Sequence, residues 1–87
     1  SAADTNPEDQ LLNRELESHL QKALQTMPLK LRDVFILGVI QKFSYDEVTQ
    51  IVGRSLLSVK TDIYRARQIA RQVMGDYLDR ARREGGK

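Results

Sequence analysis

Hydrophobic residues recur along most of this 87-residue chain at spacings of three and four, the pattern of one face of an α-helix. The first such stretch starts at Asn6-Pro7, because Asn is a favoured N-cap and Pro suits the first helical position. It ends at Met27-Pro28, since proline disfavours helical geometry in the residue before it. The apolar stripe of this helix comprises Leu12, Leu16, Leu20, Ala23, Leu24 and Met27.

A second helix is predicted from about Leu29 to Gln41. Its apolar residues are too many for one narrow stripe, so we expect it to be the most buried helix of the fold. Gly38 lies inside it, where glycine costs about 1 kcal/mol relative to alanine. Close packing against a neighbouring element is the expected reason for a glycine at this position.

The clearest start signal in the chain precedes a third, short helix, predicted from Tyr45 to Val52. Ser44 and Glu47 match the S-x-x-E capping box, in which each side chain accepts a hydrogen bond from the backbone N–H of the other residue. Gly53 then supplies the left-handed conformation with which helices often end.

After a turn of about three residues, Ser55 can cap a fourth helix that continues to about Arg83. The inward face of this helix is predicted to carry Val59, Ile63, Ala66, Ala70, Val73 and Tyr77. Two helices joined by a short glycine-containing turn are typical of a helix-turn-helix, whose second helix can enter the major groove of DNA. A helical hairpin that only packs against the core is the alternative.

The predicted fold class is therefore all-α: a four-helix domain with a C-terminal helix-turn-helix. No alternating apolar and polar run is bounded by hairpin turns, so no strand is expected. The domain is predicted over residues 6–84, with a linker or tail over residues 1–5 and a frayed tail over residues 85–87.

Composition narrows the possible function classes. The chain has no cysteine and one histidine, His19, which excludes disulfides, thiolate metal sites and multi-histidine metal sites. Neither a cofactor nor a metal is expected. The Glu15/Glu17 and Asp46/Glu47 pairs are interpreted as surface and capping acids, so no enzymatic activity is expected. No apolar run approaches the roughly 20 residues of a membrane span, and no signal peptide is visible, which favours a cytoplasmic protein without membrane association.

Charge is distributed unevenly although the net charge is only +2. Acidic residues outnumber basic ones over residues 1–53, and basic residues outnumber acidic ones over residues 54–87. This asymmetry weakly indicates a polyanionic partner for the C-terminal half, with a solvated charged helix end as the alternative.

The outward surface of the fourth helix follows from a step of about 100° per residue. Leu57, Thr61, Tyr64 and Gln68 project most directly outward. Recognition helices contact base edges mainly with their N-terminal residues. The predicted base-reading residues are Leu57, Ser58, Lys60, Thr61, Tyr64 and Arg65. The predicted DNA phosphate contacts, which position the protein without specifying sequence, are Arg54, Arg67 and Arg71. Asp62 falls near the boundary with the core face.

The stretch "MPLKLRDVFILGVIQKFSYDEVTQIVGRSLLSVKTDIYRARQIAR", residues 27–71, resembles the C-terminal region 4 domain of bacterial sigma factors, and most closely the extracytoplasmic-function group. The matching features are the "LP…R-x-V-F-x-L" style of entry, the "F/L-S-Y-x-E" box, and "G-x-S-x-x-S/T-V-K-x-x-I/L-x-R-A-R". Residues 6–26 are similar to the linker and first helix of that domain, so the resemblance covers most of the chain.

This resemblance implies sequence-specific binding of double-stranded DNA at the −35 promoter element, through the second helix of the helix-turn-helix. It also implies docking on the β flap of core RNA polymerase and occlusion by an anti-sigma factor. The domain that opens DNA at −10 does not lie within this sequence.

Four positions depart from the pattern of the family. Thr49 stands where alanine is usual, and Leu57 where glycine or another small residue is usual. Arg54 stands where a small apolar residue is usual, and Asp62 where arginine or a polar residue is usual. The departure at position 62 suggests that Asp62 weakens contact with a phosphate, that it pairs with Lys60 or Arg65, or that it acts against binding of wrong sequences. We therefore expect Asp62→Arg to raise general DNA affinity.

Two further functions remain compatible with the sequence. The chain can be a protein-interaction module of the same fold, which docks on polymerase or an anti-sigma factor with little DNA affinity of its own. It can also be the DNA-binding output domain of another kind of regulator, such as a response regulator, although the long first helix and its Asn-Pro linker argue against this.

Overall fold

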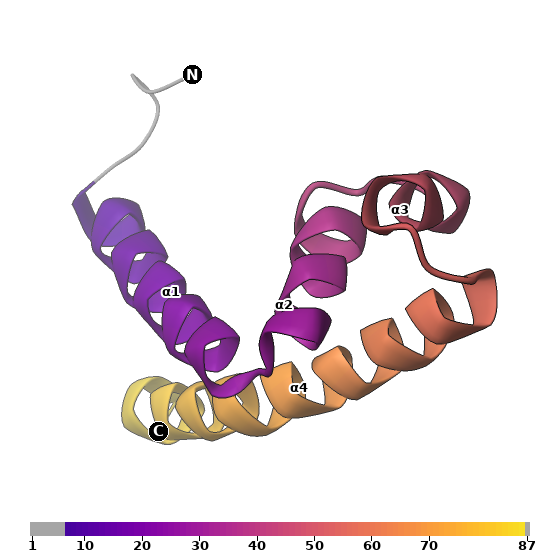
Figure 1. The fold of residues 1–87 in the computed structure, drawn as a ribbon. Helices are drawn as coiled ribbons and strands as arrows, with labels where there is room; N and C mark the ends of the chain where they lie inside the picture. The colour runs from indigo at the N-terminus through magenta and orange to yellow at the C-terminus, as the bar shows by residue number, and fades with distance from the viewer. Residues whose placement is uncertain (1–6, 87) are drawn as a thin grey trace.

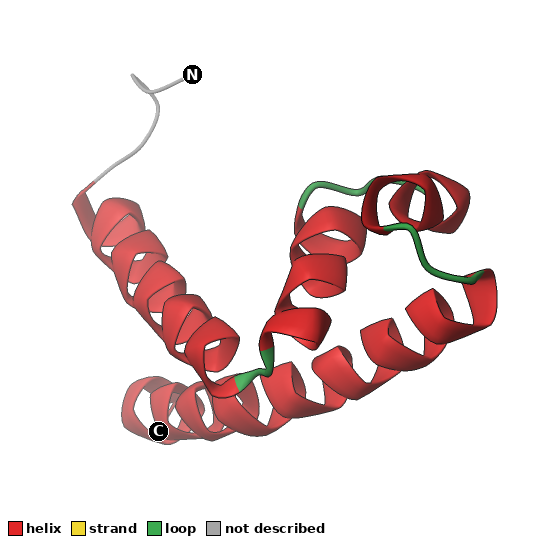
Figure 2. Cartoon of the chain, viewed as in Figure 1, coloured by secondary structure: helices red, strands yellow, loops and turns green. Residues whose placement is uncertain are grey.

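The computed structural model describes residues 7–86, with side chains described for residues 10–11 and 13–77, and over this part of the chain it is helical without strands. The helices in chain order are α1 (Pro7–Thr26), α2 (Leu29–Phe35), the π-helical segment η2 (Ile36–Ile40), α3 (Tyr45–Val52) and α4 (Leu56–Gly86). The predicted all-α fold class is confirmed. Figure 1 shows that α4 runs beneath the other helices, and Figure 2 shows the short loops that join them.

The local signals around the third helix are confirmed. The backbone N–H of Glu47 donates to Ser44 Oγ at 3.1 Å, and the N–H of Ser44 donates to Glu47 Oε1 at 2.7 Å. Gly53 has φ 70° and ends α3 in the left-handed conformation. Ser55 Oγ accepts the N–H of Ser58 at 3.2 Å, as predicted for the cap of α4. These bonds depend only on nearby residues, which explains why the sequence identifies them.

The second helix differs from its prediction. Its first half buries Leu31, Val34 and Phe35, but the chain then changes to π-helix and no residue of η2 is fully buried. A π turn holds one more residue than an α turn, so it moves the apolar residues out of the α-helical phase. The expectation that this helix is the most buried therefore holds only for α2, and Ile40 is 41% exposed.

The first helix has its predicted bounds, and the long helices differ from expectation only in the exposure of α1 and in the C-terminal extent of α4. The described part of the α1 stripe is buried only near its C-terminus, where α1 meets α2 and α4, and Leu16 is 41% exposed. Figure 1 shows the N-terminal end of α1 standing away from the rest of the molecule. Helix α4 extends beyond Arg83 and includes Gly85 and Gly86, which were expected to fray. Leu12, the predicted tail over residues 1–5, Asn6 and Lys87 lie outside the described residues or side chains.

The core consists of two clusters that α4 connects. The first joins α1, α2 and α4 through Leu24, Met27, Leu31, Phe35, Ala66 and Ala70. The second joins α2, α3 and α4 through Val34, Val48, Val59 and Ile63. Arg32 closes the end of α1, since its Nε donates to the Leu24 carbonyl at 2.9 Å and its Nη2 to the Met27 carbonyl at 3.3 Å.

Two further contacts join α4 to the rest of the fold. A Cβ atom at Gly38 would lie 3.0 Å from Ile63 Cδ1, so the predicted close approach at this glycine is confirmed and involves α4. The ring of the half-buried His19 lies 3.8 Å from that of the buried Tyr77, between centroids, and packs α1 against α4.

Candidate DNA-binding site

The candidate site is formed by α3, the turn over residues 53–55 and the N-terminal half of α4. Val48 of α3 packs in one cluster with Val59 and Ile63 of α4, which holds the two helices together. In Figure 1 this end of α4 lies far from α1 and from the C-terminus. One face of α4 is therefore buried in the second core cluster, and the opposite face is open to solvent.

The structure places most of the predicted site residues on that open face. Leu57 is 75% exposed and Tyr64 is 63% exposed, and the side chain of Arg65 is 64% exposed. Lys60 is also exposed, whereas Ser58 and Thr61 are half-buried. Among the predicted phosphate contacts, Arg67 and Arg71 are exposed. The outward direction derived from helical periodicity therefore agrees with the observed exposure of Leu57, Tyr64 and Gln68 but not of Thr61, which was predicted to project outward and is half-buried.

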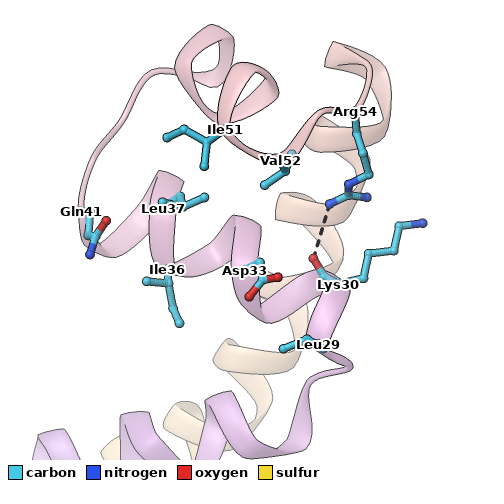
Figure 3. Close-up of a pocket in the computed structure, with 9 residues that line it drawn as sticks. All are labelled: Leu29, Lys30, Asp33, Ile36, Leu37, Gln41, Ile51, Val52 and Arg54. Atoms are coloured by element: carbon cyan, nitrogen blue, oxygen red, sulfur yellow. Dashed lines mark hydrogen bonds between the residues drawn. The ribbon is translucent and has the colours of Figure 1, made fainter.

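Arg54 differs from the other predicted phosphate contacts because its guanidinium bonds within the chain. Its Nη1 donates to Asp62 Oδ2 at 2.5 Å and to Ser58 Oγ at 3.1 Å. Its Nη2 donates to the Lys30 carbonyl at 3.4 Å, the dashed line in Figure 3. With 24% of its side chain exposed, Arg54 has much less freedom to reach a phosphate than a solvated arginine has.

Asp62 is buried, which corrects the expectation that it lies at the boundary of the core face. It is only 2% exposed, and its carboxylate faces three cations. Besides Arg54, Lys30 Nζ lies 3.7 Å from Oδ2 and Arg65 Nη1 lies 3.9 Å from Oδ1. Of the two partners predicted for Asp62, the structure contains Arg65 but not Lys60. The sequence pattern indicated which residues of α4 face the core and which face solvent. It did not indicate that Arg54 and Lys30 lie next to Asp62.

The charge state of Asp62 follows from this environment. Burial alone raises the pKa of a carboxyl group, because it disfavours the charged form. The hydrogen bond from Arg54, with the positive charges of Lys30, Arg54 and Arg65, outweighs burial and holds the pKa of Asp62 below its ordinary value. Asp62 is therefore ionised at neutral pH.

Two departures from the family pattern thus form one ion pair. A buried carboxylate needs a partner, and Arg54 supplies it from the position where a small apolar residue is usual. Burial also removes the basis for expecting that Asp62→Arg raises DNA affinity. The new arginine would face Arg54 inside the fold instead of facing a phosphate.

A groove of about 630 Å³ lies beside the helix-turn-helix, between the α2–η2 segment and α3. Figure 3 shows apolar side chains along it and charged side chains at its edge. Leu29 and Ile51, on opposite sides, are 64% and 54% exposed. The groove is lined by Leu29, Lys30, Asp33, Ile36, Leu37, Gln41, Ile51, Val52 and Arg54. Sequence periodicity did not identify it, because its walls come from separate helices.

Among the residues that the structure describes, no group of three or more His, Cys, Asp or Glu side chains is arranged to hold a metal ion. None of the described helices combines the length and apolar character that crossing a membrane requires.

Comparison with known proteins assigns the family. The profile of the family described as Sigma-70, region 4 matches residues 18–69, which include α2, α3 and the N-terminal half of α4. The chain belongs to this family. The resemblance identified in the sequence is therefore confirmed.

Two curated relatives of this region 4 domain are sigma factors of the ECF group. The chain is 33% identical over 70 residues to the ECF RNA polymerase sigma factor SigW of Bacillus subtilis, an alignment that covers 80% of this chain and 37% of SigW. It is 36% identical over 77 residues to the ECF RNA polymerase sigma factor SigE of Mycolicibacterium smegmatis, covering 88% of this chain and 28% of SigE. The chain thus spans about a third of the length of these relatives. No solved structure matches it.

Proposed function

We propose that the chain is the −35-binding domain of an ECF sigma factor, which directs RNA polymerase to promoters in the cytoplasm. The observation that carries this proposal is the exposed face of α4 directly after the capped turn. Lys60, Tyr64 and Arg65 there present long side chains to solvent at the end of the helix that enters the major groove in this motif.

Each predicted residue has a chemical role in this proposal. Lys60 and Arg65 donate hydrogen bonds to guanine O6 and N7. Leu57 and the methyl group of Thr61 contact thymine methyl groups, with Ser58 and Tyr64 completing the base-reading surface. Arg67 and Arg71 bind phosphates further along the helix and fix its orientation.

Alanine substitution tests the base-reading role. Lys60→Ala and Arg65→Ala should each weaken binding to a selected promoter duplex by about 1–3 kcal/mol and relax its sequence preference. Lys22→Ala, at an exposed position on α1, is the matched control because it removes the same charge away from the site. Unchanged affinity for both α4 variants would remove the base-reading proposal. A steep fall of affinity with salt concentration would support several phosphate contacts.

A second candidate function is docking on a protein partner, namely the β flap of RNA polymerase or an anti-sigma factor. The groove between α2 and α3 favours it, because Leu29 and Ile51 expose apolar surface across a hollow that a partner side chain can fill.

Paired variants separate the two functions. Ile51→Asp should abolish capture of the chain by the isolated β flap and leave binding to DNA unchanged, whereas Leu57→Asp should do the reverse. If Leu57→Asp loses DNA binding and even the wild-type chain is not captured by the β flap, DNA recognition is supported and docking on the flap is not. Hydrogen-exchange protection by the flap that is confined to α4 would contradict docking in the groove.

A further inference from the structure

We propose that Asp62 is a positioning residue for base recognition: through Arg54 it ties the turn to α4, and it orients the base-reading Arg65. This inference rests on the proposed function, since it assigns a role in sequence discrimination to a residue that DNA does not touch.

The first support is the number of segments that the Arg54–Asp62 pair joins. Arg54 belongs to the turn, two residues before α4 begins, and its guanidinium reaches Asp62 in the second turn of α4. It also contacts Ser58 in the first turn of α4 and the Lys30 carbonyl in α2. This side chain therefore adds a polar link between the base-reading end of α4 and α2 to the apolar packing of the second core cluster.

The second support is the burial of the carboxylate. An exposed ion pair is worth little because water screens it, but a buried carboxylate that loses its partner is strongly unfavourable. Asp62 is 2% exposed, and within the described residues every buried side-chain nitrogen or oxygen atom has a hydrogen-bond partner. Asp62 and Arg54 therefore hold each other in one arrangement.

The third support is the use of the two carboxylate oxygens. Oδ2 faces Arg54 and Lys30, whereas Oδ1 faces Arg65 Nη1 at 3.9 Å. Arg65 lies three residues after Asp62 and has an exposed side chain, so its guanidinium is otherwise free to sample many rotamers. The attraction across 3.9 Å is weak for so exposed a guanidinium, so the fixed carboxylate biases these rotamers toward its own side without locking them, which lowers part of the ordering cost of binding.

The pairing has a further consequence for phosphate contacts. Because Asp62 neutralises Arg54, the turn adds no net charge to the DNA-binding face. The salt dependence of binding should therefore reflect Arg67 and Arg71 and should not include Arg54. Arg54, which the sequence analysis predicted to contact a phosphate, is thus assigned a contact with Asp62 instead.

Asp62→Asn tests the positioning role, because it removes the charge and retains the size of the side chain. The probe is a duplex selected by the wild-type chain from a randomised library, compared with a scrambled duplex of the same composition. We expect the ratio of the two affinities to fall about tenfold, which corresponds to about 1.4 kcal/mol of lost discrimination. Affinity for the scrambled duplex should not fall.

A control for stability is needed, since Asp62→Asn also removes a native interaction. Leu24→Ala, in the first core cluster, lowers stability at a position in α1 that lies outside the helix-turn-helix. Measured at a temperature where all variants are folded by circular dichroism, Leu24→Ala should keep the wild-type discrimination. An equal loss of discrimination in Leu24→Ala would reduce Asp62 to a purely structural role and overturn the proposal.

If Asp62→Asn fails to fold, the double variant Arg54→Met with Asp62→Leu is the alternative test, because it replaces the whole pair with apolar side chains. It should lose discrimination like Asp62→Asn and keep the wild-type dependence of log affinity on log salt concentration. A slope smaller by about one unit would show that Arg54 binds a phosphate. Arg65→Ala distinguishes the base-reading role of Arg65 from the positioning role of Asp62. If Arg65→Ala lowers discrimination and Asp62→Asn leaves it at the wild-type level, the positioning role alone is overturned. A wild-type chain that selects no sequence overturns the proposed function as well.

Discussion

Alanine substitutions at two helical glycines measure how tightly α4 is seated on the α2–η2 segment. Gly75 lies within α4, and a Cβ atom added there meets no atom within 4 Å. Gly38 lies within η2, and a Cβ atom added there meets Ile63 Cδ1 at 3.0 Å. Neither glycine has a positive φ. The two substitutions therefore share one backbone effect and differ in packing.

The shared effect is stabilising. Glycine in a helix is less favourable than alanine by about 0.5–1 kcal/mol, because it loses more backbone freedom on folding. Gly75→Ala should gain this amount. For a domain of this size, a gain of 1 kcal/mol raises the melting temperature by about 4–8 °C.

The packing term at Gly38 opposes that gain. A distance of 3.0 Å is shorter than ordinary carbon contacts, so the tip of Ile63 would have to withdraw by a few tenths of an ångström. Ile63 is 1% exposed and is packed with Val34, Val48 and Val59, which opposes this withdrawal. Overpacking of this kind costs about 1–3 kcal/mol. Gly38→Ala should therefore range from neutral to about 2.5 kcal/mol destabilising.

Urea denaturation of both variants and the wild-type chain gives the two free energies of unfolding, with the m-value as a check for two-state behaviour. The informative quantity is their difference, about 1–3 kcal/mol in favour of Gly75→Ala. Equal stabilisation by both substitutions would refute this reasoning, because it would show that the Ile63 side chain moves without an energetic cost. The close packing of α4 on η2 would then not require a glycine at position 38.

Three other predictions concern single positions. Lys42 adopts a left-handed backbone with φ 63°, so Lys42→Gly should stabilise the chain by up to about 1 kcal/mol in urea denaturation; a loss would mean that its side chain contributes more than the backbone conformation costs. Ser44→Ala should cost about 1 kcal/mol by removing half of the capping box, and Ser44→Asp should recover most of that loss because aspartate also caps. The pKa of Asp62 is lowered in the folded chain, so the unfolded chain binds a proton more readily at this residue. The ionised Asp62 therefore contributes to stability above the ordinary pKa of 3.8, and this contribution is lost as the pH falls below that value. Thermal melts across the acid range should show this loss in the wild-type chain and a shallower one in Asp62→Asn; identical pH profiles would contradict the assignment.

The sequence predicted much of which side of α4 faces solvent, but it did not predict the contacts that the site residues make with other helices. A step of about 100° per residue along α4 was enough to assign Leu57, Tyr64 and Arg65 to the solvent side. The same step placed Asp62 near a boundary, and periodicity cannot decide on which side of a boundary a residue falls. Its burial was decided by Arg54 and Lys30, which reach it from outside α4.

By itself, the sequence determined where the short third helix begins and ends, where α4 is capped, and that the described fold is helical. The two helix starts depend on hydrogen bonds from a backbone N–H to a side-chain oxygen three residues away, so the residues that make them stand together in the chain. Only the tertiary structure decided that the second helix changes to π-helix, that Leu16 stays exposed, and that a groove opens between α2 and α3. It also decided that two unusual residues, Arg54 and Asp62, form one buried pair. The physical reason is that burial and ion pairing depend on which distant segments meet, and that is settled by packing around α4.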